Sequence, residues 1–327
     1  MQAQTVAKIF NINNELTFNV QLNTIFQFQF ANNPVYKQWC GLCGIESNQL
    51  FSVETMPYLP ISFFKTHSVI STNFTAERVF ESSGTTGTIN SKHFVKEVAL
   101  YEQSFNKGFN FFYGNAADWC VIGLLPSYLE RNNSSLVFMV NELIAQSKHT
   151  LSGFYLNEYD KLNALLQQLE SEQQATLLIG VTFGLLDFAE KHTLPLKNTI
   201  IMETGGMKGR RTEMTRNEVH SILQNAFDAK NIHSEYGMTE LLSQAYSKGN
   251  GRFVCPPWMK VVVRDEDDPL QVKAHGKGVL NIIDLANIYS CSFIATEDIG
   301  IVHDDGSFEV LGRIDNSDIR GCSLLAV

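Results

Sequence analysis

Two near-continuous apolar runs constrain the fold of this chain most. They are "WCVIGLL" at 119–125 and "ATLLIGVTF" at 175–183. A strand that faces water on one side alternates apolar and polar residues, whereas a strand buried on both faces is apolar throughout. A third and shorter run, "NTIIMETGG" at 198–206, stops at two glycines. The three runs therefore predict strands in the interior of a largely parallel sheet.

Helical patterns lie around these runs. The four leucines of "DKLNALLQQLE" (160–170) share one helical face. In "TRNEVHSILQNAF" (215–227), Thr215 and Glu218 have the spacing of a capping box, and an apolar stripe follows them. Strands that alternate with helices predict crossover units, and hence an α/β fold.

The pattern changes after about residue 252. Three short strand patterns, "WMKVVV", "GVLNII" and "GSFEVL", are separated by turns such as "DEDDP" and "HDDG". We therefore expect an α/β body over residues 1–251 and a smaller, mostly antiparallel β-rich subdomain over residues 252–327.

Composition excludes some classes of function. The 327 residues carry a formal net charge of −9, which argues against nucleic acid as the main partner. The opening segment has no charged start followed by an apolar block, so no signal peptide is expected. No apolar run has the length of a membrane-spanning helix. These features favour a cytoplasmic protein.

Five of the six cysteines are expected to be inert. Cys120, Cys255 and Cys291 stand singly in apolar or strand-like contexts, which predicts reduced and buried thiols. Cys40 and Cys43 form a C-x-x-C pair. A polar helix start precedes that pair, and no second pair supplies zinc ligands, so neither a redox nor a metal role is predicted.

The strongest local signal is "VFESSGTTGTINSKHF" at 79–94. The glycine and hydroxyl residues from Ser82 to Gly87 follow a short apolar segment. Glycines allow backbone N–H groups to approach an anion, and hydroxyls add donors, which suits a nucleotide phosphate. The segment is not a P-loop, because no Lys-Ser or Lys-Thr follows the second glycine. An ordinary Ser/Gly turn is the alternative.

Four further segments supply complementary groups. They are "ETGGMKGRR" (203–211), "SEYGMTE" (234–240), "ATEDIG" (295–300) and "LGRIDNSDIRG" (311–321). Together they offer phosphate donors, an aromatic face, a carboxylate suited to a metal and a carboxylate suited to a ribose.

In this order, the segments resemble the motifs of the adenylate-forming superfamily of acyl-CoA synthetases, firefly-type luciferases and adenylation domains. The resemblance implies ATP and Mg²⁺ as cofactors, with Glu240 as the metal ligand. It also implies that Thr239 contacts the α-phosphate, and that Asp298 and Arg313 contact the ribose. The other implied nucleotide-binding residues are Ser82, Ser83, Gly84, Thr85, Thr86 and Gly87 for the phosphates, and Gly205, Gly206, Tyr236 and Gly237 around the adenine.

Two departures from that pattern point to a narrower resemblance. The Pro-Lys pair after the loop is missing, so that Lys92 is the first lysine and the catalytic candidate there. The sequence also stops after the G-R-x-D motif, and the usual separate C-terminal domain is not expected. The chain is similar to the LuxE family of acyl-protein synthetases and related LuxE/PaaK-type acyltransferases. The segments that carry this resemblance are "PISFFKTH" (60–67), "ESSGTTGT", "TEDIG" and "GRIDNSDIRGCSLL".

This resemblance implies an enzyme that activates a carboxylic acid, expected to be a fatty acid, as acyl-AMP. The acyl group then moves to a cysteine near the C-terminus, for which Cys322 is the matching position. The nearby Arg320 favours its thiolate. The body would bind nucleotide and acyl group, the tail would accept the acyl group, and a reductase, a carrier protein or CoA would receive it. Two alternatives stay open: an acyl-CoA or aryl-CoA ligase, and a non-catalytic nucleotide- or acyl-binding subunit.

Overall fold

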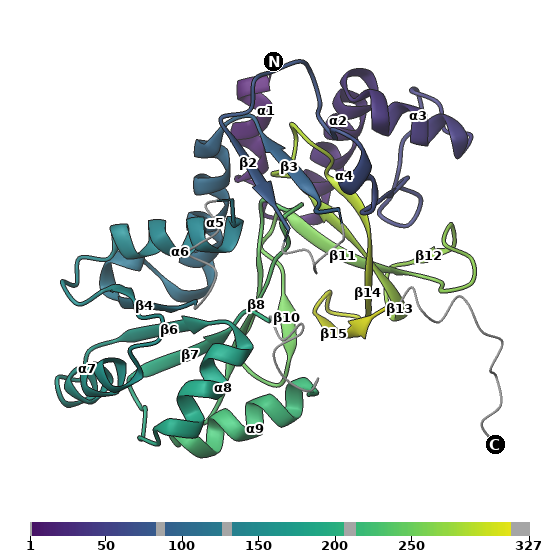
Figure 1. The fold of residues 1–327 in the computed structure, drawn as a ribbon. Helices are drawn as coiled ribbons and strands as arrows, with labels where there is room; N and C mark the ends of the chain where they lie inside the picture. Colours follow the sequence, from purple (N-terminus) through teal and green to yellow (C-terminus); the bar gives the residue numbers. More distant parts are fainter. Residues whose placement is uncertain (1, 83–88, 126–132, 206–213, 315–327) are drawn as a thin grey trace, which may run out of the picture.

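The computed structural model describes residues 2–82, 89–125, 133–205 and 214–314 (Figure 1). The residues between and beyond these ranges include Ser83–Gly87, Gly206 and Cys322 of the predicted site. The helices are α1 (Gln2–Ile9), α2 (Glu15–Asn32), α3 (Pro34–Leu42), α4 (Phe63–Thr66), α5 (Val98–Tyr113), α6 (Ser135–Gln146), α7 (Tyr159–Ser171), α8 (Thr182–Lys191) and α9 (Arg216–Phe227), with a 3₁₀ turn η1 (Ala116–Asp118).

One large sheet runs through the described part of the chain. Its strand order is β12-β11-β13-β14-β15-β10-β9-β8-β7-β6-β4-β5, with β1 added to β14, and β2 and β3 form a separate hairpin. The strands are β1 (Leu59–Pro60), β2 (Arg78–Glu81), β3 (Lys92–Val95), β4 (Cys120–Leu124), β5 (Gly153–Phe154), β6 (Thr176–Gly180), β7 (Thr199–Glu203), β8 (His233–Tyr236), β9 (Ala245–Ser247), β10 (Arg252–Val254), β11 (Met259–Arg264), β12 (Val272–Lys273), β13 (Gly276–Asp284), β14 (Phe293–Val302) and β15 (Phe308–Arg313).

The sheet has a parallel half and an antiparallel half. Strands β5, β4, β6, β7 and β8 pair in parallel and are joined by the crossover helices α6 to α9. From β8 to β9 onward the pairs along the sheet are antiparallel. The mixed α/β fold predicted from the alternating pattern is confirmed.

Helices cover both faces of the parallel half. On one face, Val121, Ile179 and Met202 belong to the core that includes α5 and α6. On the other face, Ile122, Leu178 and other strand residues pack with α7, α8 and α9, and Figure 1 shows these two helix layers on opposite sides of β4, β6 and β7. Because each strand has apolar neighbours on both sides, β4 and β6 are buried at every residue.

A local sequence signal marks the start of the last helix in this half. Thr215 and Glu218 form the predicted capping box at the start of α9. The apolar pattern predicts a strand over residues 175–183, and this prediction is wrong at the end of the run. The strand β6 stops at Gly180, and Val181 is the residue before the first turn of α8. The run stays apolar because the start of α8 is itself buried, and a buried helix and a buried strand look alike in a short segment.

A bulge interrupts the last strand pair of the antiparallel half. Ile299 lies opposite Gly312, but the next residue, Gly300, lies opposite Val310. Leu311 is therefore the extra residue, and its side chain is half exposed. A bulge bends its strand and redirects the side chains that follow. The first side chain beyond Gly312, which follows the bulge, is that of Arg313.

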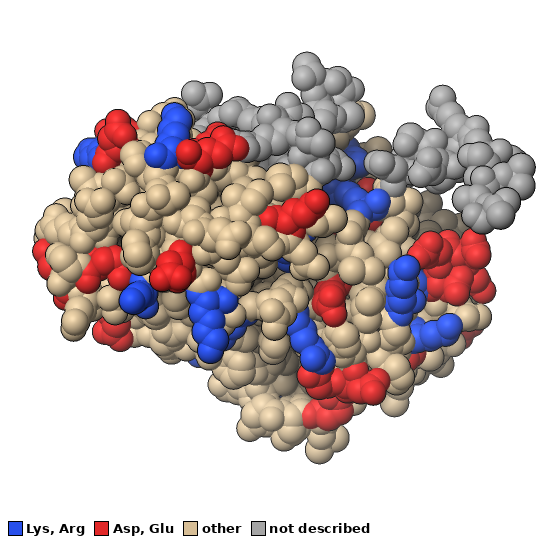
Figure 2. Space-filling model, turned by 90° about the horizontal axis from the view of Figure 1, so that it is seen from below, with Lys and Arg blue, Asp and Glu red and all other residues tan. Residues whose placement is uncertain are grey.

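The surface matches the acidic composition. On the face drawn in Figure 2, the basic side chains of the described residues are scattered among acidic ones and form no continuous basic patch. No helix within the described ranges is both long enough and apolar enough to cross a membrane.

Candidate functional site

Three of the predicted nucleotide residues meet at the junction of the two halves. The Tyr236 hydroxyl donates a hydrogen bond to Asp298 Oδ2 at 2.8 Å, and Arg313 Nε lies 3.2 Å from Asp298 Oδ1. Tyr236 ends β8, Asp298 lies within β14, and Arg313 follows the bulge of β15. Burial, and then the charge of Asp298, raise the pKa of Tyr236 far above its usual value, so the phenol stays protonated as a donor.

Strand geometry explains this meeting. Burial along β14 alternates after its first two residues, and Asp298 occupies a buried position of that alternation. Its cross-strand partner on β15 is Arg313. Opposite charges on paired strand positions stabilise each other. The pair therefore presents one carboxylate that a hydroxyl and a guanidinium hold in place.

Glu240 lies in a second part of the site. Its side chain is buried, with a residue exposure of 6%. Burial raises the pKa of this carboxyl, whereas a hydrogen bond with Ser91 and the charges of Arg313 and Lys65 lower it. The Ser91 N–H also donates to the Ser82 hydroxyl at 2.9 Å. Ser82 thus closes the stem of the β2–β3 hairpin, and Ser91 connects this stem to Glu240.

His93 and Asn287 hold the segment that carries Thr239 and Glu240. His93 Nδ1 lies 2.8 Å from the Thr239 carbonyl oxygen, and Nε2 lies 3.0 Å from Asn287 Oδ1. The Asn287 amide donates to the Glu240 carbonyl at 2.7 Å. Burial lowers the pKa of His93 to about 4, so the imidazole is neutral at neutral pH.

These two residues were not predicted for the site. His93 directly follows Lys92 in the sequence. It is a buried residue of β3 that bonds a distant turn. No sequence signal marks Asn287, because its partners lie far away along the chain.

Gly205 follows β7 at the edge where the adenine was expected. Its φ of +74° is a conformation that favours glycine. Its N–H donates to Glu203 Oε2 at 2.8 Å, and its carbonyl accepts from the Thr182 N–H at 2.9 Å. The second glycine of this pair, Gly206, lies outside the described residues.

Gly237 packs closely against the side chain of Glu235. A Cβ at this position would lie 2.5 Å from Glu235 Oε1. Glu235 is buried on β8, and burial together with the charge of Glu203 raises its pKa to about 8. Lys92, the catalytic candidate of the loop, lies on β3 with a half-exposed side chain, and its Nζ is 3.7 Å from Glu81 Oε1. Ser83–Gly87 and Cys322 lie outside the described residues.

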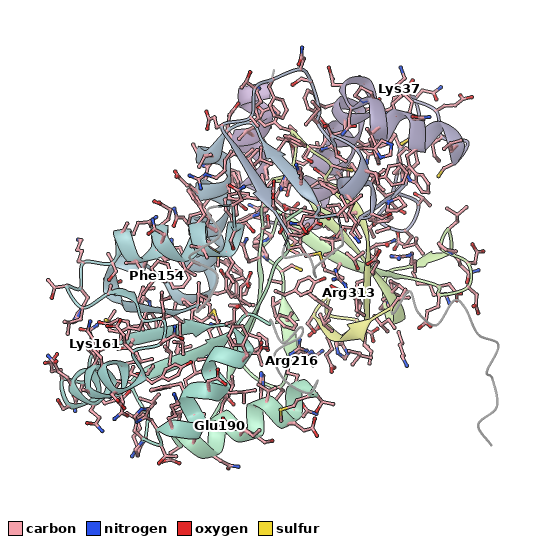
Figure 3. All side chains as sticks on the ribbon, in the orientation of Figure 1. Lys37, Phe154, Lys161, Glu190, Arg216 and Arg313 are labelled. Carbon is pink, nitrogen blue, oxygen red and sulfur yellow. The ribbon has the colours of Figure 1, made fainter. Side chains whose placement is uncertain are left out.

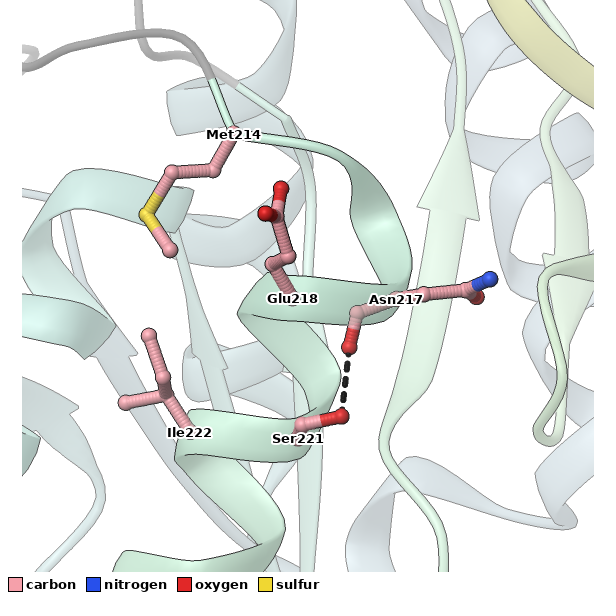
Figure 4. A pocket seen from close by; sticks show the side chains of 5 residues that line it. All are labelled: Met214, Asn217, Glu218, Ser221 and Ile222. Atoms are coloured by element: carbon pink, nitrogen blue, oxygen red, sulfur yellow. Dashed lines mark hydrogen bonds between the residues drawn. The ribbon is translucent and has the colours of Figure 1, made fainter.

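A hollow of about 400 Å³ lies elsewhere, on α9. Figure 4 shows its lining, where the Ser221 hydroxyl donates to the Asn217 carbonyl at 2.7 Å. Among the described residues, Glu218 is the only charged residue of the lining, and its carboxylate is already used by the capping box with Thr215. The described lining therefore lacks the grouped polar side chains of the Tyr236–Asp298–Arg313 site.

Comparison with known proteins identifies the family. Residues 7–326 match the family described as acyl-protein synthetase, LuxE. The chain belongs to the LuxE family of acyl-protein synthetases. It is therefore an enzyme, one that joins an acyl group to a protein, and the resemblance inferred from the motifs is confirmed.

Two curated relatives match over most of the chain. Long-chain-fatty-acid–luciferin-component ligase from Aliivibrio fischeri is 23% identical over 91% of this chain and 85% of its own length. The protein of the same name from Vibrio harveyi is 22% identical over 91% of this chain and 84% of its own length.

Solved structures show the fold. ATP-bound MatB from Rhodopseudomonas palustris superposes with a TM-score of 0.52 at 16% identity, and an ATP-bound RpMatB-BxBclM chimera does so with a TM-score of 0.54 at 17% identity. Each match covers 72% of this chain but only 47% of the solved one, so this chain spans about half the length of these structures. The predicted N-terminal-domain fold of adenylate-forming ligases is confirmed.

Proposed function

We propose that this acyl-protein synthetase uses ATP to activate a carboxylic acid as acyl-AMP and then carries the acyl group on Cys322. The observation that supports this most strongly is the contact of Tyr236, Asp298 and Arg313, which come from three separate motifs. A buried carboxylate between a hydroxyl and a guanidinium is suited to accept hydrogen bonds from the two hydroxyls of a ribose.

The first step forms a bond between the substrate carboxylate and the α-phosphorus, and pyrophosphate leaves. It is needed because oxide is a poor leaving group, whereas AMP is a good one. The hairpin stem at Ser82 and the Thr239–Glu240 segment would border the phosphates, and the Gly205 turn would border the adenine. Fixed donors and charges around the phosphates stabilise the charge that develops there.

Glu240 would hold Mg²⁺. Within the described ranges no three His, Cys, Asp or Glu side chains gather closely enough to bind a metal by themselves. Mg²⁺ does not need such a cage, because it commonly binds one or two carboxylates together with substrate phosphates and water. The single buried carboxylate of Glu240 fits that mode. Bound there, the ion would neutralise phosphate charge.

In the second step a thiolate attacks the acyl carbon, a thioester forms, and AMP leaves. The described cysteines are poor candidates for this thiolate. Burial raises the pKa of all five, to about 12 for Cys40. Thiols with raised pKa values are seldom ionised at neutral pH. This favours Cys322, two residues after Arg320, as the acceptor, on a tail that ends the proposed unit 252–327.

The substrate and the receiving partner follow from the relatives. Both curated relatives are named for long-chain fatty acids and a luciferin component. We therefore propose a fatty acid as the substrate, and a reductase or carrier protein as the receiver of the acyl group.

The test uses Cys322→Ser, with Cys43→Ser as the control because Cys43 is a partly exposed thiol of the body. Cys322→Ser should keep acid-dependent exchange of pyrophosphate into ATP and lose the hydroxylamine-sensitive acyl-protein. Cys43→Ser should retain both. An acyl group mapped to another cysteine would contradict the Cys322 role. Acyl-CoA formed with no acyl-protein would favour the CoA-ligase alternative, and no ATP binding would favour a non-catalytic subunit.

A further inference from the structure

A buried ion pair connects the Gly205 turn to the antiparallel half. Glu203 ends β7, and its Oε2 accepts hydrogen bonds from the Gly205 N–H at 2.8 Å and from the Thr182 hydroxyl at 3.1 Å. Its Oε1 lies 3.4 Å from Arg216 Nε and 3.6 Å from His220 Nε2. The carboxylate therefore joins the ends of two parallel strands to α9.

Glu203 is ionised at neutral pH in spite of its position. Burial raises its pKa, but the hydrogen bond with His220 and the charge of Arg216 outweigh that effect and lower the pKa to about 2. A buried carboxylate of this kind needs its cationic partner, because removing one partner leaves an uncompensated charge.

Arg216 reaches from this carboxylate to the last described strand. Its Nη1 donates to the Val310 carbonyl at 2.8 Å, and its guanidinium lies 5.1 Å above the ring of Phe253. Gly251, with a φ of +65°, leaves room for the arginine stem, since a Cβ there would lie 3.1 Å from Arg216 Cδ. Arg216 thus contacts β7, β10 and β15 at once.

The hydrogen bond from Arg216 to the Val310 carbonyl lies beside the bulge of β15. Val310 is the residue directly before the extra residue of the bulge, and Arg313 follows three positions later. Figure 3 places Arg216 and Arg313 close to the junction of the two halves. The bulge sets the register in which Arg313 lies opposite Asp298. Arg216 binds the carbonyl of Val310, the residue directly before the bulge.

We propose that Arg216 is a positioning residue for nucleotide binding: anchored by Glu203, it holds the bulge of β15 so that Arg313 stays on Asp298. The proposal rests on the nucleotide site proposed above. It also couples the two sides of that site, because Glu203 holds the Gly205 turn with the same carboxylate that anchors Arg216.

The test compares Arg216→Met with Arg252→Met. Arg252 is a matched control. It is also an arginine, but it bonds Asp305 and Ser307 in the turn between β14 and β15, away from the bulge. Arg216→Met should raise the Kd for ATP about tenfold, the size expected for one lost charge-assisted hydrogen bond. The Km for the acid should change less than twofold. Arg252→Met should bind ATP as the wild type does.

Two further variants separate positioning from general damage. Arg216→Lys keeps the charge beside Glu203 but lacks the second donor arm, so its Kd should lie between those of wild type and Arg216→Met. Adding Glu203→Gln to Arg216→Met should weaken ATP binding no further. Equal loss of affinity for ATP and acid, or an Arg216→Met protein that binds ATP normally, would overturn the positioning role. A wild type that binds no ATP would overturn the nucleotide site, and this proposal with it.

Discussion

The parallel and antiparallel halves of the sheet bury polar side chains in different places. In the parallel half, β4 and β6 are buried at every residue, and polar groups such as Glu203 and Thr182 lie where strands end or helices begin. In the antiparallel half, polar groups lie inside strands, as Asn281 and Asp298 do.

The difference follows from what covers each strand. A strand with helices on both faces has no side that tolerates a charge, so its polar chemistry is confined to its ends. A strand with a less buried side alternates, and a carboxylate can then occupy one position of the alternation beside a charged partner. At the proposed site, the parallel half contributes the Tyr236 hydroxyl and the Gly205 turn, and the antiparallel half contributes the charged side chains of Asp298 and Arg313.

The largest effect is expected for Asp298→Ala in the antiparallel half. The change removes the carboxylate that is proposed to accept hydrogen bonds from two ribose hydroxyls, and each hydrogen bond to a charged group contributes about 1.5–3 kcal/mol. We expect ATP affinity measured by calorimetry to fall on the order of a thousandfold. Asp305→Ala, which removes the exposed partner of Arg252 in the same half, should leave affinity unchanged. An equal loss of ATP affinity in the two variants would contradict the special role of Asp298 in the antiparallel half.

A smaller effect, on stability, is expected for Glu235→Gln at the border of the halves. Its pKa is raised to about 8 by burial and by Glu203, so the folded chain keeps a proton that the unfolded chain loses near its usual value of 4.5. Stability contributed by this proton is present below about pH 4.5 and is lost as the pH rises to 8. The wild type should therefore lose on the order of 3 kcal/mol of unfolding free energy across this window.

Glu235→Gln should flatten that loss, as measured by urea unfolding at pH 5 and pH 8. Glu297→Gln, on the less buried side of β14, is the control and should follow the wild type. A steep loss in both variants would assign the pH dependence to another group.

The smallest effect is expected for Thr215→Ala in the parallel half. The Thr215 hydroxyl accepts a hydrogen bond from the Glu218 N–H at the start of α9. Its loss should cost about 1 kcal/mol of unfolding free energy, the usual contribution of such a cap. ATP affinity of the folded protein should stay within twofold of wild type. A large loss of affinity would show that the start of α9 contributes to binding beyond Arg216.

Local periodicity accounts for the part of the structure that the sequence predicted. The buried strands, the capping box at Thr215 and the helix of "DKLNALLQQLE" each depend on neighbours within a few residues, so their signals are readable along the chain. The end of β6 was mispredicted because burial makes strand and helix equally apolar there. The proposed boundary at residue 252 stays a prediction.

The sequence by itself determined the family, the alternation of strands and helices, and the motif residues Tyr236, Asp298 and Arg313. Only the tertiary structure decided which residues contact them and hold them in position. Tyr236 bonds Asp298 across 62 positions, and Arg216 reaches the Val310 carbonyl across 94. Such contacts depend on strand register and on one bulge, and a shift of a single residue in register turns a side chain to the other face of the sheet. No local pattern records that choice, because it is made by the packing of strands that are distant along the chain.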